Sequence, residues 1–188
     1  MANCCEFQLK AVAKDEKTLW RLFDILEYKD PEWFISRVQY VETIADPYKE
    51  GDGLYAIELL GDVAWGTSRW FSAEPDPTQR AVNGATFTTL VEICKSLGIA
   101  VEIWAREPGL GYQSHSFCNP KGEWTEDSVD WNEELDKDGE VVGEDGGCDT
   151  FGQFLLAIEL YNGIPEEVVP EQSQENEKKN MPQVEEKA

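Results

Sequence analysis

The sequence contains little positive charge, because 16 Lys and Arg residues stand against 38 Asp and Glu residues, a net charge of −22. Such an acidic protein repels phosphate groups, which argues against direct nucleic-acid binding and against binding to an anionic membrane surface. A run of about eighteen apolar residues is also missing, so no transmembrane helix is predicted. The first residues lack the basic flank and apolar stretch of a secretory signal, and we expect a cytoplasmic protein.

Cysteine and histidine are too few, and too scattered, for a recognisable catalytic or metal site. The five cysteines form no CxxC pair, and their odd number makes a poor disulfide framework. A zinc site would need ligands from distant positions, so buried reduced thiols are the simpler interpretation. His115 is the only histidine and lies three residues from Cys118; on a strand these two side chains would point to opposite faces. No cofactor or metal ligand is therefore predicted.

Negative charge is concentrated in one segment, residues 123–149, which holds twelve carboxylates and one basic residue, Lys137. Half of the net charge of the chain lies there. Buried unpaired carboxylates are very costly, so this segment must stay in water, bind cations or face a basic partner.

The composition of this segment is compatible with calcium binding and with carboxylate catalysis, but the sequence contains no specific motif for either. Residues 136–140 and 144–147 mix carboxylates with glycines, as oxygen-ligand loops do, yet an EF-hand needs Gly at the sixth loop position, where Leu135 or Val141 stands. Acid pairs about 5–10 Å apart, as glycoside hydrolysis requires, occur by chance among so many acids. The Gly109–Gly111 segment matches a tight turn rather than a phosphate-binding loop.

Hydrophobic patterns in the first half predict a strand at 5–13, a helix at about 15–28 and strands at 38–41 and 54–65. The last of these is expected to be long or bulged near Gly61. A short helix should start at Pro31, and 49–53 should form a turn. The apolar face of the first helix is predicted to comprise Leu19, Leu22, Phe23 and Leu26, with Lys14 or Asp15 at its start.

In the second half, Thr86 or Thr88 is expected to cap a helix that ends at Gly98. Its buried face should comprise Leu90, Ile93, Cys94 and Leu97. A strand follows, with Ile99, Val101 and Ile103 on one side, and then a hairpin from 112 to 127. Asp138-Gly139 predicts a second hairpin turn, between Leu135 and Val141. Residues 72–85 read as a loop and 151–160 as a short helix or strand.

The order strand, helix, strand, strand, helix, strand predicts an α+β protein with a ferredoxin-like split βαβ antiparallel sheet. An added C-terminal hairpin and an acidic extension should follow it. We expect a core over 1–122, an acidic extension over 123–164 packed on or beside it, and a disordered acidic tail over 165–188.

Three stretches, MANCCEF at 1–7, GDVAW at 61–65 with Trp70-Phe71, and AREPGLGY at 105–112, resemble segments of the Api92-like or YubB-like proteins of phages, plasmids and other mobile genetic elements. The opening MANCCEF is similar to the family's M-P-N-W-C start, with Ala2 and Cys4 in place of its proline and tryptophan. GDVAW at 61–65 with Trp70-Phe71 resembles an aromatic stretch of the family, and AREPGLGY at 105–112 resembles its E-P-G-x-G turn. The similarity covers roughly residues 1–125. It implies a ferredoxin-like fold and carries no catalytic residues over to this chain.

Several tryptophans are expected in loops or at edges beside acidic residues, where aromatic rings can anchor a partner while charges steer it. Trp65, Trp70, Trp124 and Trp131 have this character, although they could equally cover the open face of the sheet. We therefore expect a non-catalytic protein that binds a basic protein surface, with a nucleic-acid mimic as one form of that function. A metal-dependent enzyme and a structural accessory domain are the alternatives. The predicted partner-binding residues are Trp124, Glu126, Asp127, Asp130, Trp131, Glu133, Glu134, Asp136 and Asp138.

Overall fold

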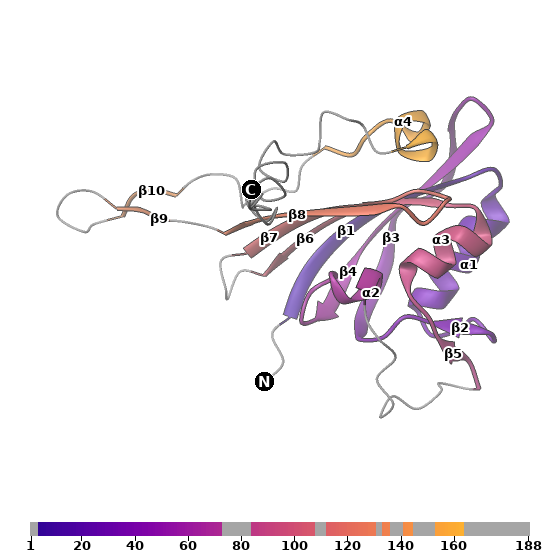
Figure 1. The fold of residues 1–188 in the computed structure, drawn as a ribbon, viewed down its shortest axis with the longest axis horizontal. Coiled ribbons are helices and arrows are strands. Elements are labelled where there is room, and N and C mark those ends of the chain that lie inside the picture. The colour runs from indigo at the N-terminus through magenta and orange to yellow at the C-terminus, as the bar shows by residue number, and fades with distance from the viewer. Residues whose placement is uncertain are drawn as a thin grey trace, which may run out of the picture.

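The computed structural model describes residues 4–72, 84–107, 112–130, 133–135, 141–144 and 153–163. Its centre is a six-stranded antiparallel sheet with the strand order β3-β4-β1-β6-β7-β8 (Figure 1). The strands are β1 (Cys4–Ala13), β3 (Val38–Gly51), β4 (Leu54–Ala64), β6 (Ala100–Glu107), β7 (Tyr112–Cys118) and β8 (Trp124–Asp130). The predicted α+β class is confirmed.

Helices cover the two faces of this sheet unequally. Figure 1 shows α1 (Glu16–Leu26) and α3 (Leu90–Leu97) on one face and α4 (Ala157–Asn162) on the other. The short α2 (Arg69–Ser72) contributes Trp70 and Phe71 to the same core as α1 and α3. Within the described residues no helix is long and apolar enough to cross a membrane.

The main core forms between the sheet and α1, α3 because apolar residues alternate along the central strands. Phe7 and Leu9 on β1 lie beside Ile57 and Leu59 on β4, all at most 1 % exposed. Six of the residues predicted for the helix faces are buried in this core: Leu19, Leu22, Leu26, Leu90, Ile93 and Cys94. The predicted Phe23 and Leu97 are only partly buried, and Ile25, which was not predicted, is fully buried.

Helix ends follow local chemistry. Asp15 caps α1, as predicted, by accepting hydrogen bonds from the backbone N–H and the hydroxyl of Thr18. The cap of α3 is Thr89, whose hydroxyl accepts from the N–H of Glu92, so the prediction of Thr86 or Thr88 was wrong by one residue or more. Gly98 ends α3 in the left-handed conformation, at φ 64°, as predicted.

The prediction of a short helix that starts at Pro31 was wrong. Residues 33–34 form β2 (Trp33–Phe34), which pairs in parallel with β5 (Thr86–Phe87). Asp30 favours this extended course because its carboxylate accepts the N–H groups of both Glu32 and Trp33. The pairing joins two segments about 50 residues apart, which local sequence signals do not encode.

The second strand is much longer than predicted, because β3 continues through the expected turn as far as Gly51. The turn itself lies at Asp52 and Gly53, both with positive φ. Strand β4 is long, as predicted, and its pairing with β1 is continuous, whereas register shifts occur in its pairing with β3.

The hairpin predicted at 112–127 is confirmed as β7 and β8, so residues 124–130 belong to the main sheet. Strands β9 (Glu133–Leu135) and β10 (Val141–Glu144) pair as a separate two-stranded ribbon, which Figure 1 draws beyond the end of β8. This pairing confirms the second hairpin. The acidic tail over 165–188 and most of the loop at 72–85 lie outside the described residues.

Trp70 was wrongly placed among loop or edge residues. Its side chain is 2 % exposed and packs edge-on against Phe7, with the ring centroids 5.1 Å apart. Its indole N–H donates a hydrogen bond to the carbonyl of Ser36. A tryptophan buried this way stabilises the core and cannot anchor a partner.

Candidate functional site

Strand β8 carries four of the predicted partner-binding residues: Trp124, Glu126, Asp127 and Asp130. It is the last strand in the sheet order and pairs with β7 alone. Its second edge therefore has no strand partner within the described part of the chain, and such an edge can pair with an added strand. Glu133 and Glu134 lie on β9, while Trp131, Asp136 and Asp138 lie outside the described residues.

The side chains described on β8, from Trp124 to Asp127, point to both faces of the sheet. Trp124 stacks on Phe71 of α2 with ring centroids 5.1 Å apart, and Glu126 accepts a hydrogen bond from the hydroxyl of Ser68. Both therefore face the helices. Asp127 faces the other way and lies opposite His115 in the register of β7. Trp124 is still 37 % exposed, so part of its ring remains accessible at the surface.

Negative charge at this edge has no positive counterpart among the residues that the structure describes. Glu123 accepts a hydrogen bond from the amide of Asn119, and Glu126 accepts from a hydroxyl. Neither of these carboxylates, nor Asp127, forms a salt bridge with a described Lys or Arg. Uncompensated surface carboxylates create a negative potential that attracts basic groups over roughly a Debye length of 8–10 Å.

Glu102 and His115 form a polar pair on the open face, which we define as the sheet face opposite α1 and α3. Glu102 on β6 is fully buried, and its Oε1 lies 2.8 Å from Nε2 of His115. The imidazole stacks on Trp104 with ring centroids 3.5 Å apart and also contacts Phe117. Cys118 lies on the opposite face, as predicted, so it is not a thiol partner of His115.

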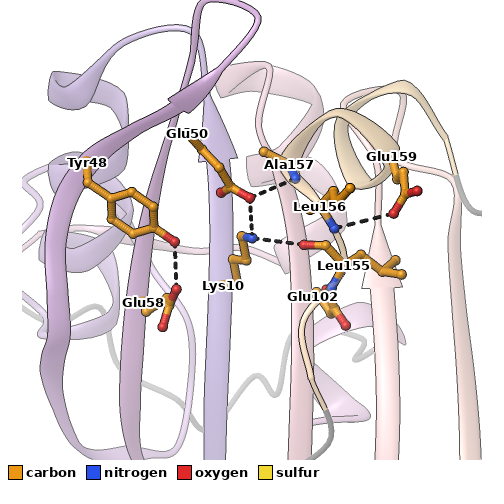
Figure 2. A network of polar contacts seen from close by, with 9 residues as sticks. All are labelled: Lys10, Tyr48, Glu50, Glu58, Glu102, Leu155, Leu156, Ala157 and Glu159. Atoms are coloured by element: carbon orange, nitrogen blue, oxygen red, sulfur yellow. Dashed lines mark hydrogen bonds and ion pairs between the residues drawn. The ribbon is translucent and has the colours of Figure 1, made fainter.

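The open face also holds the segment 153–163, which we call the strap and which contains α4. Figure 2 shows how three side chains hold its backbone. Lys10 Nζ lies 2.8 Å from the carbonyl of Leu155, and Glu102 accepts the N–H of the same residue at 2.8 Å. Glu50 accepts the N–H of Ala157 at 3.0 Å and pairs with Lys10 at 2.7 Å.

Beside this network, Tyr48 donates a hydrogen bond to Glu58 at 2.6 Å (Figure 2). Burial and this bond both raise the pKa of Tyr48, because each favours the neutral phenol. Tyr48 therefore stays protonated and acts as a hydrogen-bond donor, not as a base.

A group of buried oxygen atoms lies on the helix-covered side of the sheet. The hydroxyls of Thr67, Ser114 and Ser116 and one carboxylate oxygen of Glu107 are buried without a hydrogen-bond partner. Burial and the charge of Glu107 together raise the pKa of the Cys5 thiol to about 12. A thiol with so high a pKa is a poor nucleophile at neutral pH.

Among the described residues, no group of three or more His, Cys, Asp or Glu side chains is arranged to hold a metal ion. The described cysteines are all free thiols: Cys4, Cys5, Cys94 and Cys118. The candidate loops for calcium, at 136–140 and 144–147, lie almost wholly outside the described residues.

Sequence reasoning missed the strap network. One signal was present: Lys10 and Glu102 are charged residues with apolar neighbours on both sides in the sequence, and the structure pairs them across β1 and β6. The third member, Glu50, was assigned to a turn, because KEGDG has the composition of one.

No protein-family model matches this sequence, and neither a curated protein nor a solved structure shows significant similarity to the chain. The resemblance to YubB-like proteins therefore stays a prediction.

Proposed function

We propose that this chain is a non-catalytic binding protein whose acidic edge strand, β8, recognises a basic surface on another protein. The observation that carries the proposal is that, within the described residues, β8 combines an edge without a strand partner, carboxylates without a salt bridge to Lys or Arg, and a partly exposed tryptophan. A basic partner can be steered by the carboxylates, add a strand to the edge and contact the ring of Trp124.

A basic surface that normally binds DNA or RNA is the partner class that fits this edge best. Successive residues of a strand point to opposite faces, so carboxylates on one face recur every second residue at best, about 6.6 Å apart. That spacing imitates a row of phosphates only approximately. The proposed nucleic-acid mimicry therefore depends more on total negative charge than on a matched spacing of charges. Duplex DNA that competes for the same basic surface should displace the protein from such a partner.

We also propose that the fold is ferredoxin-like and that the protein acts in the cytoplasm for a mobile genetic element of the kind that encodes YubB-like proteins. The strand order β6-β1-β4-β3 supports the fold assignment, because α1 connects β1 to β3 and α3 connects β4 to β6. Strands β7 and β8 then extend that sheet on the side of β6.

The proposal can be tested with two variants of equal charge. Glu126→Gln with Asp127→Asn removes two charges from β8, and Glu42→Gln with Asp46→Asn removes two from β3, at the opposite edge of the sheet. The probe is a fluorescently labelled peptide rich in lysine and arginine, added at low ionic strength. We expect the β8 variant to bind about fivefold more weakly, as two surface ion pairs would predict, and the β3 variant to bind as the wild type does. Equal loss in both variants would show that the peptide senses net charge alone and would overturn the assignment to β8.

A further inference from the structure

The strap is held to the open face as a peptide ligand is held to a receptor. Its three anchored main-chain groups are the carbonyl of Leu155 and the N–H groups of Leu155 and Ala157. Each is held by a charged side chain from a different strand, so the receptor side of the contact is built by the sheet itself (Figure 2). Contacts to main-chain groups do not depend on the side chains of the segment that is bound.

Selectivity comes from a small apolar cluster next to these anchors. Ala157 and Leu160 are 4 % and 2 % exposed, and the three-residue spacing places both on the same side of α4. The sheet residues that receive them come from four strands: Val12, Leu54, Ala56, Ala100 and Phe117. A fitting segment therefore has an extended start and one helical turn, with a small residue and a leucine three positions apart.

The face is complete without the strap. Lys10, Glu50 and Glu102 lie on strands β1, β3 and β6 of one hydrogen-bonded sheet. The anchoring bonds join residues separated by 145, 107 and 53 positions in the sequence. None of these contacts therefore depends on the immediate chain neighbours of the strap, and the same segment from another molecule can form every one of them.

We propose that the open face is an exchangeable peptide-binding site and that its second occupant is the strap of another copy of this chain. The proposal concerns a different face from the acidic edge at β8 and does not rest on the function proposed for that edge. Because the strap belongs to the same chain as the open face, its effective concentration at that face is near the millimolar range. Exchange then produces dimers only at high protein concentration, or when the strap of the receiving copy is weakened.

The test uses the full chain and a labelled peptide of residues 153–163, QFLLAIELYNG. In the chain variant Leu160→Asp, a carboxylate that the apolar cluster rejects loosens the attached strap. We expect this variant to bind the peptide at least tenfold more tightly than the wild-type chain does. The same peptide with aspartate at position 160 should not bind, and Lys10→Met in the variant chain should weaken binding about tenfold through the lost bond to the Leu155 carbonyl.

Circular dichroism establishes that each variant is folded, and Leu160→Ala replaces Leu160→Asp if the latter unfolds the sheet. Three outcomes would overturn the proposal: a folded variant that does not bind the peptide, binding that survives Lys10→Met, or equal binding of the aspartate peptide. Light scattering at high protein concentration provides a second test, because exchange between wild-type copies predicts a dimer that Leu160→Asp abolishes. A wild-type chain that stays monomeric under those conditions would contradict exchange between copies.

Discussion

The Lys10 ammonium donates a hydrogen bond to the carbonyl of Leu155 at 2.8 Å, which joins the first strand to a segment 145 residues later in the chain. Lys10 is 5 % exposed and pairs with Glu50, so a single side chain links β1, β3 and the strap. This contact explains why the strap lies on the sheet at a defined position.

Lys10→Met should loosen the strap without unfolding the sheet. Loss of the ammonium leaves Glu50 without its salt bridge and the Leu155 carbonyl without its donor, at a cost of about 1–3 kcal/mol. Hydrogen exchange should then speed up at the amides of Leu155 and Ala157 and stay slow in β1 and β6. Lys17→Met on the exposed side of α1 is the control, and equal exchange in both variants would contradict this role of Lys10.

Asp30→Asn tests a buried carboxylate that holds β2 in place. Burial raises the pKa of Asp30, but bonds from Arg21, Trp33 and Glu32 outweigh burial, so the pKa lies below its usual value. A carboxyl group with a lowered pKa adds stability above its unfolded pKa of about 3.9, and the contribution disappears as pH falls through the folded value. Urea unfolding should show a free energy of unfolding about 1–2 kcal/mol lower for the variant at pH 7, and this difference should shrink as pH falls below about 3.9. A difference that does not change with pH would refute this explanation.

Ser116→Ala should cost no stability. The hydroxyl is fully buried and has no hydrogen-bond partner, so removing it removes a desolvated polar group. The expected change in the free energy of unfolding lies between zero and a gain of about 1 kcal/mol. A loss of more than about 1 kcal/mol in urea unfolding would show that the hydroxyl has a hydrogen-bond partner in solution.

Gly61→Ala should be strongly destabilising, because this glycine lets two strands and an aromatic ring approach closely. A Cβ atom there would lie 2.2 Å from the carbonyl oxygen of Tyr40 and 2.8 Å from the ring of Phe7. Backbone cannot move aside as a flexible side chain can, so we expect a loss of about 2 kcal/mol or more by thermal unfolding. An unchanged melting temperature would mean that β3 and β4 are farther apart than described.

The sequence predicted those parts of the fold that depend on neighbouring residues. Asp15 and Gly98 end helices through local hydrogen bonds and backbone conformation, and the alternation around Phe7 marks a strand directly. The course of Trp33 and Phe34 could not be predicted, because it depends on pairing with a segment near Phe87.

The candidate site was predicted only in part for the same reason. The high density of negative charge in the sequence identified the acidic residues of β8. Their position at a sheet edge depends on the strand order, which only the folded structure shows. The strap network was missed because Lys10, Glu50 and Glu102 meet Leu155 and Ala157 only after folding. Trp70 shows the converse error, since acidic neighbours suggested exposure where the ring is buried.

The most direct test of the central claim is the salt dependence of binding to the labelled basic peptide, measured by fluorescence anisotropy between about 0.05 and 0.2 M salt. For the wild type we predict that affinity falls steeply with salt. The slope should be clearly smaller for Glu126→Gln with Asp127→Asn and unchanged for Glu42→Gln with Asp46→Asn. An affinity that does not change with salt, or equal slopes for all three proteins, would contradict a binding site at the acidic edge of β8.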